Sequence, residues 1–268
     1  MAIVNVNGVN LYYELHGPDN ADVIVFSNGI FMSTASWGYQ IAAMKEHFRV
    51  LVYDCRGMWK SEHPAGPYSM DQHADDLSAL LLALDIPSAH VAGISYGGEV
   101  SMTFAIKYPH MVKSLIVSSS VSQLDPLLSA IGQSWTAAIQ SGNPDTLFEV
   151  TLPYNFSESW IAENQGILDA SRKKYAEMDF TSVGELMAAF TRLDLTGQLK
   201  QINAPTLVLV GEEDILKSRK YAEIIADEIA DAELIIIPHA GHAVCLEKPA
   251  SFNSAILGFV LKHCEVVS

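Results

Sequence analysis

The stretch His90–Gly98, with the sequence HVAGISYGG, constrains the fold more than any other part of the chain. A short apolar run leads into a G-x-S-x-G pattern around Ser95, and a segment of helical character, 99–108, follows at once. Glycines on both sides of a serine permit a turn too tight for larger residues. We therefore predict a buried strand, a sharp turn that strains Ser95, and a helix whose first N–H groups lie near the serine oxygen.

Apolar, strand-like runs alternate with helical patterns along most of the chain. These runs lie at 3–6, 11–15, 23–26, 50–53, 91–92, 115–117, 205–210 and 234–237. The first two flank Asn7-Gly8, a pair typical of a hairpin turn because the turn needs positive φ angles. The later runs alternate with helices, which predicts right-handed βαβ units. We expect an α/β fold with a mostly parallel, eight-stranded sheet flanked by helices.

The alternation of strand-like runs and helical patterns stops after the sixth run, at 115–117, and resumes only at the seventh, at 205–210. The intervening segment shows helical patterns and carries many large aromatic residues: Trp135, Tyr154, Phe156, Trp160, Tyr175, Phe180 and Phe190. A helical insertion at this point would lie over the carboxyl edge of the sheet. We predict a core formed by 1–120 and 197–268 and a helical cap formed by 121–196.

Three residues with complementary chemistry each follow a strand-like run, in the order Ser95, Asp214, His242. A serine hydroxyl is a poor nucleophile until a neutral imidazole accepts its proton. A carboxylate on the other ring nitrogen fixes the tautomer and stabilises the imidazolium. The G-x-S-x-G pattern by itself arises by chance in about one chain in ten of this length. The hypothesis that Ser95 is a nucleophile therefore depends on the acid and the histidine that follow it in the chain.

Several other residues compete for these roles. Asp125 follows the sixth run and is the alternative acid, whereas Glu212 and Glu213 are typical of a solvated loop. His239 is the rival histidine, but its place next to a strand favours a structural role. Cys245 lies close to His242, and we interpret it as a buried small hydrophobic residue in preference to a reactive thiol.

Composition narrows the functional classes. The formal net charge of −15 disfavours partners such as nucleic acid or an anionic membrane. The three cysteines lack paired spacing, and the N-terminus lacks a secretion-signal pattern, so we expect a cytoplasmic protein. No run is apolar enough to span a membrane. Dinucleotide, P-loop and metal-ligand motifs are missing from the sequence, so we expect chemistry without a cofactor or metal. The sequence is compatible with a homodimer as well as with a monomer.

The pieces together resemble the α/β-hydrolase superfamily over almost the whole chain, nearest the branch of 3-oxoadipate enol-lactonases, esterases and C–C-bond hydrolases. The matching segments are Asn7-Gly8, Asn28-Gly29, Asp54–Gly57, Gly93–Gly98, Gly211–Asp214 and Gly241-His242. The resemblance implies Ser95 as nucleophile, His242 as base and Asp214 as the acid that orients it. It also implies an oxyanion hole formed by the backbone N–H groups of Ile30 and Tyr96.

Two positions depart from the pattern of that superfamily. Asn28 stands where its members usually have histidine, which changes the hydrogen bonding behind the oxyanion loop. Trp59 stands where the turn after Asp54 usually has a second glycine, which questions the local shape of that turn. Neither departure touches Ser95 or His242.

The resemblance predicts a serine hydrolase that cleaves a small ester or lactone through an acyl-enzyme intermediate. A C–C-bond hydrolase or thioesterase would use the same residues, and a ligand-binding signalling protein with slow turnover is the alternative from another class. The cap has many acids and few bases, namely Arg172, Lys173, Lys174 and Arg192. Arg192 is the isolated candidate for holding a substrate carboxylate. The surrounding apolar residues favour an uncharged, apolar substrate.

Overall fold

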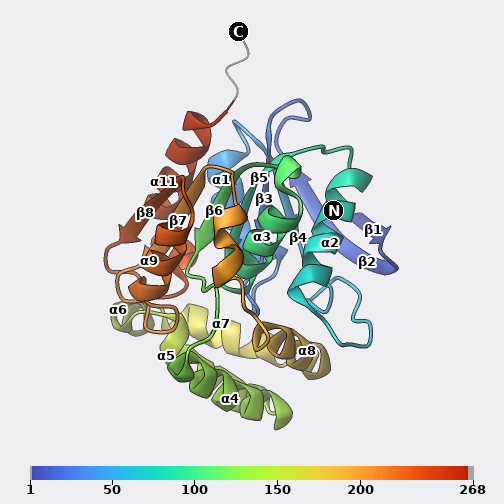
Figure 1. Ribbon diagram of the computed structural model, residues 1–268. Helices are drawn as coiled ribbons and strands as arrows, with labels where there is room; N and C mark the ends of the chain where they lie inside the picture. Colours follow the sequence, from blue (N-terminus) through green and yellow to red (C-terminus); the bar gives the residue numbers. More distant parts are fainter. Residues whose placement is uncertain (1, 265–268) are drawn as a thin grey trace.

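The computed structural model describes residues 2–264, in which eight strands form one sheet (Figure 1). The strands are β1 (Ala2–Val6), β2 (Val9–His16), β3 (Val23–Ser27), β4 (Arg49–Tyr53), β5 (Ala89–Ile94), β6 (Val112–Ser118), β7 (Thr206–Gly211) and β8 (Ala232–Ile237). Their order across the sheet is β1-β2-β4-β3-β5-β6-β7-β8. The pairs β1–β2 and β2–β4 are antiparallel, and all the others are parallel. The predicted eight-stranded, mostly parallel sheet is confirmed.

The hairpin between β1 and β2 turns at the predicted pair of residues. Asn7 has a φ of 49° and Gly8 a φ of 74°, and Val6 pairs directly with Val9. Asparagine and glycine tolerate these left-handed angles better than other residues do. The turn therefore sets the register of β1 against β2.

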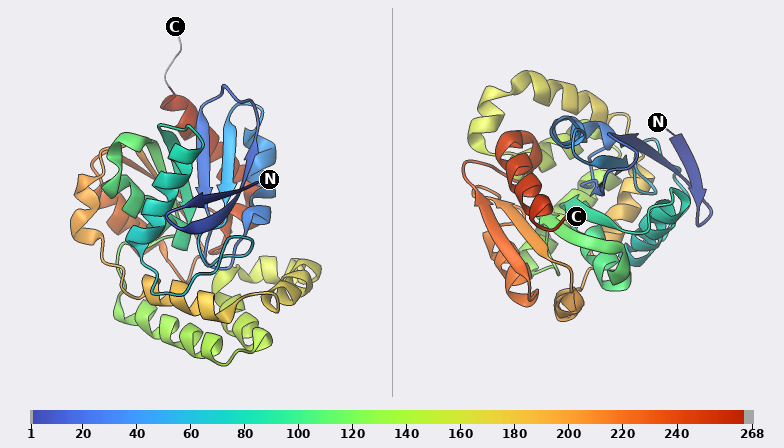
Figure 2. Two further views of the ribbon diagram at one scale, coloured as in Figure 1. Left: turned by 90° about the vertical axis from the view of Figure 1, so that its right-hand side faces the viewer. Right: turned by 90° about the horizontal axis from the view of Figure 1, so that it is seen from above.

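Helices cover both faces of the sheet (Figure 2). The core helices are α1 (Gly38–Met44), α2 (Met70–Ala83), α3 (Tyr96–Lys107), α9 (Arg219–Glu228), α10 (Val244–Glu247) and α11 (Pro249–Lys262), with short 3₁₀ turns η1 (Thr34–Trp37), η2 (Pro109–Met111) and η3 (Thr196–Gln201). Buried residues of α2, α3 and α9 join one hydrophobic cluster, and those of α1 and α11 join another. Neighbouring residues of β5 point to opposite faces, because Val91 belongs to the first cluster and Ala92 to the second. Within residues 2–264, no helix is long and apolar enough to cross a membrane.

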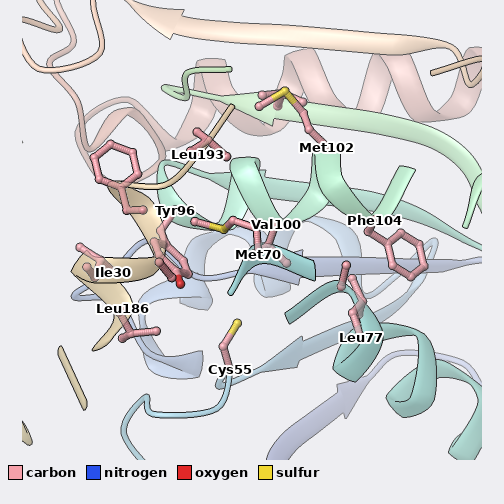
Figure 3. Close-up of a cluster of buried hydrophobic side chains, with 14 of the residues drawn as sticks. Ile30, Cys55, Met70, Leu77, Tyr96, Val100, Met102, Phe104, Leu186 and Leu193 are labelled. Atoms are coloured by element: carbon pink, nitrogen blue, oxygen red, sulfur yellow. The ribbon is translucent and has the colours of Figure 1, made fainter. Parts of the chain in front are cut away.

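A helical insertion follows β6, as predicted, and lies at one end of the sheet in both figures. It consists of α4 (Pro126–Gln140), α5 (Pro144–Asn155), α6 (Glu158–Glu163), α7 (Gln165–Tyr175) and α8 (Phe180–Phe190). Leu186 of α8 is buried in the same cluster as Ile30 and Tyr96 of the core (Figure 3). The insertion is therefore packed onto the core through apolar contacts. The domain boundaries at residues 120 and 197 stay a prediction.

Candidate active site

Ser95 lies in a strained turn between β5 and α3. Its φ is 55° and its ψ is −121°, a conformation that residues other than glycine seldom adopt. The backbone of β6 holds the turn in place, because the Ser95 N–H donates to the carbonyl of Ser118 at 2.8 Å. A side chain at Gly97 would overlap the carbonyl of Ser27, so glycine is required there. The strain is maintained by the packing of strand and helix around it.

The three residues Ser95, His242 and Asp214 form a chain of hydrogen-bonding distances. His242 Nε2 lies 2.9 Å from Ser95 Oγ, and His242 Nδ1 lies 2.9 Å from Asp214 Oδ2. The other oxygen of Asp214 accepts the backbone N–H groups of Leu216 and Lys217, at 3.0 and 2.8 Å. Burial raises the pKa of Asp214, but the charge and hydrogen bond of His242 and the Lys217 N–H outweigh it, so the net pKa is lowered. A carboxylate is thus held ionised against the imidazole.

Two backbone N–H groups flank the serine. Tyr96 is the first residue of α3, and Ile30 follows β3 in the loop that begins with Asn28-Gly29. Both residues line the space next to Ser95. Tyr96 begins α3, and the first N–H groups of a helix have no acceptor within the helix. Such donors are what a developing oxyanion requires.

A cavity of about 170 Å³ opens in front of Ser95 and His242. Its walls come from both parts of the chain. The core contributes Gly29, Ile30, Ile94 and Leu246, and the cap contributes Trp135, Phe148, Leu152, Phe156, Tyr175 and Met178. The cap aromatics contact one another and the core: Phe31 lies 5.6 Å from Trp135 and 5.4 Å from Tyr175, between ring centroids. The site is therefore a mostly apolar chamber at the carboxyl edge of the sheet.

Comparison with known proteins agrees with this geometry. The family described as the alpha/beta hydrolase fold matches residues 22–249. The chain belongs to the α/β-hydrolase family.

Relatives of this α/β-hydrolase carry several activities in their names. The RutD protein of Pantoea ananatis, named as a provisional carbamate hydrolase, is 29% identical over 260 residues, which cover 94% of each chain. The 3-oxoadipate enol-lactonase 2 of Acinetobacter baylyi is 28% identical over 251 residues, 92% of each chain. The crystal structure of the enol-lactonase from Burkholderia xenovorans LB400 superimposes with a TM-score of 0.92 at 26% identity, covering 97% of this chain and all of that one.

In this α/β-hydrolase, Asn28 connects the loop of Ile30 to the buried core. The Asn28 amide donates to Asp54 Oδ1 at 3.0 Å, and the same oxygen accepts the Thr34 N–H at 2.8 Å. The Asn28 oxygen accepts the indole N–H of Trp37 at 2.7 Å. Asparagine thus fills the histidine position of the superfamily with both a donor and an acceptor in use.

The competing candidates lie away from Ser95. Asp125 caps α4, where its Oδ1 accepts the Leu128 N–H at 2.8 Å, and its other oxygen pairs with Lys220. His239 has a side chain that is 76% exposed, and its Nδ1 faces Glu213 at 3.6 Å. Cys245 is fully buried, and burial raises the pKa of its thiol to about 12, so it is a packed, unreactive residue.

The cap cations are arranged differently from what the sequence suggests. Arg192 is exposed, and its Nη2 donates to the Tyr68 carbonyl at 2.6 Å, outside the walls of the cavity. Arg172 pairs with Asp145 and Glu149 on the surface of the cap. Lys174, which the sequence did not single out, is the cap cation that lines the cavity. Its position on α7 depends on the packing of the cap, which no local pattern reveals.

A buried ion pair next to the site was also missed by sequence reasoning. Lys217 Nζ lies 2.5 Å from Glu99 Oε1, and both side chains are almost fully buried. Glu99 belongs to the first turn of α3, the helix that begins directly after Ser95. Lys217 lies in the loop that follows Asp214. The pair therefore joins the loop that carries the acid to the helix that follows the nucleophile. Burial raises the pKa of Glu99, and the charge of Lys217 offsets only part of this effect.

The loop of His242 is hydrogen-bonded to the cap. The Ala243 N–H donates to the Asn155 carbonyl at 2.9 Å. Ser157 Oγ donates to Glu247 Oε2 at 2.6 Å, and the Ser157 N–H contacts the same oxygen at 3.2 Å. The position of the imidazole thus depends on the end of α5 and the start of α6.

One cluster in residues 2–264 has the donor types of a metal site, at the opposite end of the sheet from Ser95. The ligand atoms of Asp22, His90 and Cys264 lie within 4.8 Å of one another. Asp22 already pairs with Lys113 Nζ at 2.5 Å, and His90 Nδ1 lies 2.8 Å from Ser114 Oγ. These partners already use the carboxylate and one ring nitrogen of the cluster.

Proposed function

We propose that this protein is a serine hydrolase that cleaves a small, uncharged ester or lactone through an acyl-enzyme intermediate. The observation that carries the proposal is the continuous chain Ser95–His242–Asp214, which ends at the wall of an apolar cavity. Membership of the α/β-hydrolase family supports it.

In the first half-reaction, the Ser95 oxygen attacks the substrate carbonyl carbon while His242 Nε2 accepts the hydroxyl proton. Asp214 holds the neutral imidazole with its proton on Nδ1, so that Nε2 is free to accept. The carbonyl oxygen becomes an oxyanion beside the N–H groups of Ile30 and Tyr96. His242 then returns the proton to the departing alcohol oxygen, which leaves an acyl group on Ser95.

In the second half-reaction, water replaces the alcohol. His242 removes a proton from water as its oxygen attacks the acyl carbon, and the same two N–H groups stabilise the second oxyanion. The proton passes to Ser95 as the acid product leaves. For a lactone, the alcohol and the acid stay joined in one hydroxy acid.

The cavity favours a neutral substrate. A carboxylate buried against Trp135, Phe148 and Phe156 would lose its hydration, and no buried lysine or arginine of residues 2–264 lines this cavity. The nearby Lys217 is already paired with Glu99. Lys174 reaches the wall of the cavity but is exposed, so water screens its charge. A compact, apolar ester or lactone fills the chamber at lower cost.

The names of the relatives agree with acyl transfer to a serine. An enol-lactone and a carbamate both present a carbonyl carbon with a leaving heteroatom, and the same chain of residues could attack either. Thioesters and activated C–C bonds place different leaving groups at that carbon. These substrates are therefore alternatives within one mechanism.

The experiment is steady-state and burst hydrolysis of p-nitrophenyl acetate by the wild type and by Ser95→Ala. Many turnovers by the wild type and none by a folded Ser95→Ala variant are expected. A burst followed by a stall would favour a ligand-binding signalling protein. Equal turnover by both proteins would refute the role of Ser95. A panel of a butyrolactone, an acyl thioester, a carbamate and a vinylogous diketone then ranks the leaving groups by kcat/KM.

A further inference from the structure

Trp59 has a backbone conformation that disfavours tryptophan. Its φ is 43°, in the left-handed region, where a bulky side chain collides with its own backbone. The superfamily pattern places glycine here, which meets no such collision. The tryptophan therefore brings strain to a turn that could be made without it.

Hydrogen bonds on both sides hold the strained turn. The Met58 N–H donates to the Cys55 carbonyl at 2.9 Å, and the Ser61 N–H donates to the Met58 carbonyl at 3.0 Å. The Trp59 carbonyl accepts His63 Nε2 at 3.1 Å. The other ring nitrogen of His63 lies 3.1 Å from Ser182 Oγ of the cap helix α8. The backbone of the turn is thus held by the core and by the cap together.

Trp59 borders two neighbouring cavities. It lines the chamber of about 170 Å³ in front of Ser95 and also a cleft of about 500 Å³, and it shares this place with Ile30, Ser33, Lys174 and Met178. The cleft continues past it, with Thr34, Lys60, His63, Glu177 and Asp179 along its walls. A substrate chain that extends from the chamber into the cleft would run along Trp59.

We propose that Trp59 is a specificity-determining residue, whose indole closes the end of the Ser95 chamber and limits the length of the acyl or alcohol chain. The inference rests on the proposed function, since it names the size of substrate that the same site accepts. Removal of the ring joins the chamber to the neighbouring cleft and admits longer chains.

Two substitutions separate the ring from the strain. Trp59→Gly and Trp59→Ala both remove the indole, but only glycine also relieves the left-handed backbone. Both variants should therefore extend the range of chain lengths, while Trp59→Gly should unfold at a higher temperature than Trp59→Ala. Trp59→Phe keeps an aromatic wall and should keep the limit. Phe180→Ala, in a cap residue outside both cavities, is the matched control.

The measurement is kcat/KM for p-nitrophenyl acetate, butyrate and octanoate, and for ethyl, butyl and octyl acetate. In one of the two series, the ratio of long to short substrate should rise by about tenfold or more in Trp59→Gly and Trp59→Ala and stay unchanged in Phe180→Ala. Unchanged ratios in both series, with the variants folded, would refute the proposal.

A binding arm separates this inference from the proposed function. Calorimetric titration of ethyl butyrate and ethyl octanoate into Ser95→Ala and into Ser95→Ala/Trp59→Ala needs no turnover. Ethyl octanoate should bind more tightly than ethyl butyrate only in the variant that lacks Trp59. If the wild type hydrolysed none of the esters, that binding result would retain the chamber limit and reject the hydrolase. Turnover by the wild type without any effect of Trp59 on either measurement would retain the hydrolase and reject the chamber limit.

Discussion

Asn28 and Asp54 are joined by a buried hydrogen bond of 3.0 Å that ties the loop of Ile30 to the end of β4. Asp54 also accepts the N–H groups of Thr34 and Lys60, so one carboxyl group holds the segment after β3 and the turn after β4 together. Burial nevertheless raises the pKa of Asp54 to about 6, because these donors only partly replace water. Ionisation of this group therefore opposes folding.

We expect Asp54 to make stability depend on pH. Its pKa rises from 3.8 in the unfolded chain to about 6 in the fold, so its contribution is fully present below pH 4 and is lost as the pH rises to about 6. The full change is about 3 kcal/mol. Asp54→Asn should flatten the pH dependence of the free energy of unfolding between pH 4 and 7, as measured with urea. The exposed Glu46→Gln is the control, and an equal slope in wild type and Asp54→Asn would contradict this account.

Asp214→Asn should lower kcat by about a thousand- to ten-thousand-fold, because an amide favours the wrong tautomer of His242. Asp125→Asn should leave kcat unchanged, since asparagine caps a helix as well as aspartate does. Both variants are assayed with p-nitrophenyl acetate after circular dichroism confirms their fold. A large loss in Asp125→Asn together with an active Asp214→Asn would transfer the role of acid to the residue after β6.

Lys217→Met should destabilise the fold by about 3–5 kcal/mol, because Glu99 is left as a buried charge without a partner. The loss should be smaller at low pH, since the raised pKa of Glu99 lets the carboxyl group take up a proton. The double variant Glu99→Gln/Lys217→Met should recover most of the stability. Additive effects in this double-mutant cycle would show that the two groups do not interact.

Ethyl butyrate and monoethyl succinate differ only by a carboxylate in place of a methyl group, and they test the charge of the substrate. We expect kcat/KM to favour butyrate by about tenfold or more. Lys174→Gln should change the ratio by less than about threefold, because the ammonium is exposed. Arg192→Ala, outside the chamber, should not change it. A preference for succinate that Lys174→Gln abolishes would point to an anionic lactone instead.

Local patterns in the sequence predicted those parts of the fold that one short segment determines. The turn at Ser95 follows from glycines that only a tight strand–helix junction needs, and Asn7-Gly8 sets its hairpin by the same logic. The parallel pairing of the strands from β3 to β8 follows from the alternation of strands and helices. Each of these features depends on backbone geometry, which neighbouring residues control.

Contacts between distant segments were beyond such patterns. Glu99 and Lys217 look like ordinary helix and loop charges in the sequence, and only the packing of α3 against the Asp214 loop buries them together. Lys174 and Arg192 both lie near helix ends of the cap, and no periodicity states which one reaches the chamber. The sequence questioned the turn at Trp59, but only the structure reveals the cavities beside its ring.

The hydrogen bonds from Asn155 and Ser157 to the segment 243–247 mean that the cap is not an interchangeable module. A cap transplanted from a relative to change selectivity would also have to present a carbonyl to Ala243 and a hydroxyl to Glu247. Without them, the buried Glu247 would lose its donors and the imidazole its fixed position. Redesign of this hydrolase is therefore better directed at single wall residues than at whole caps.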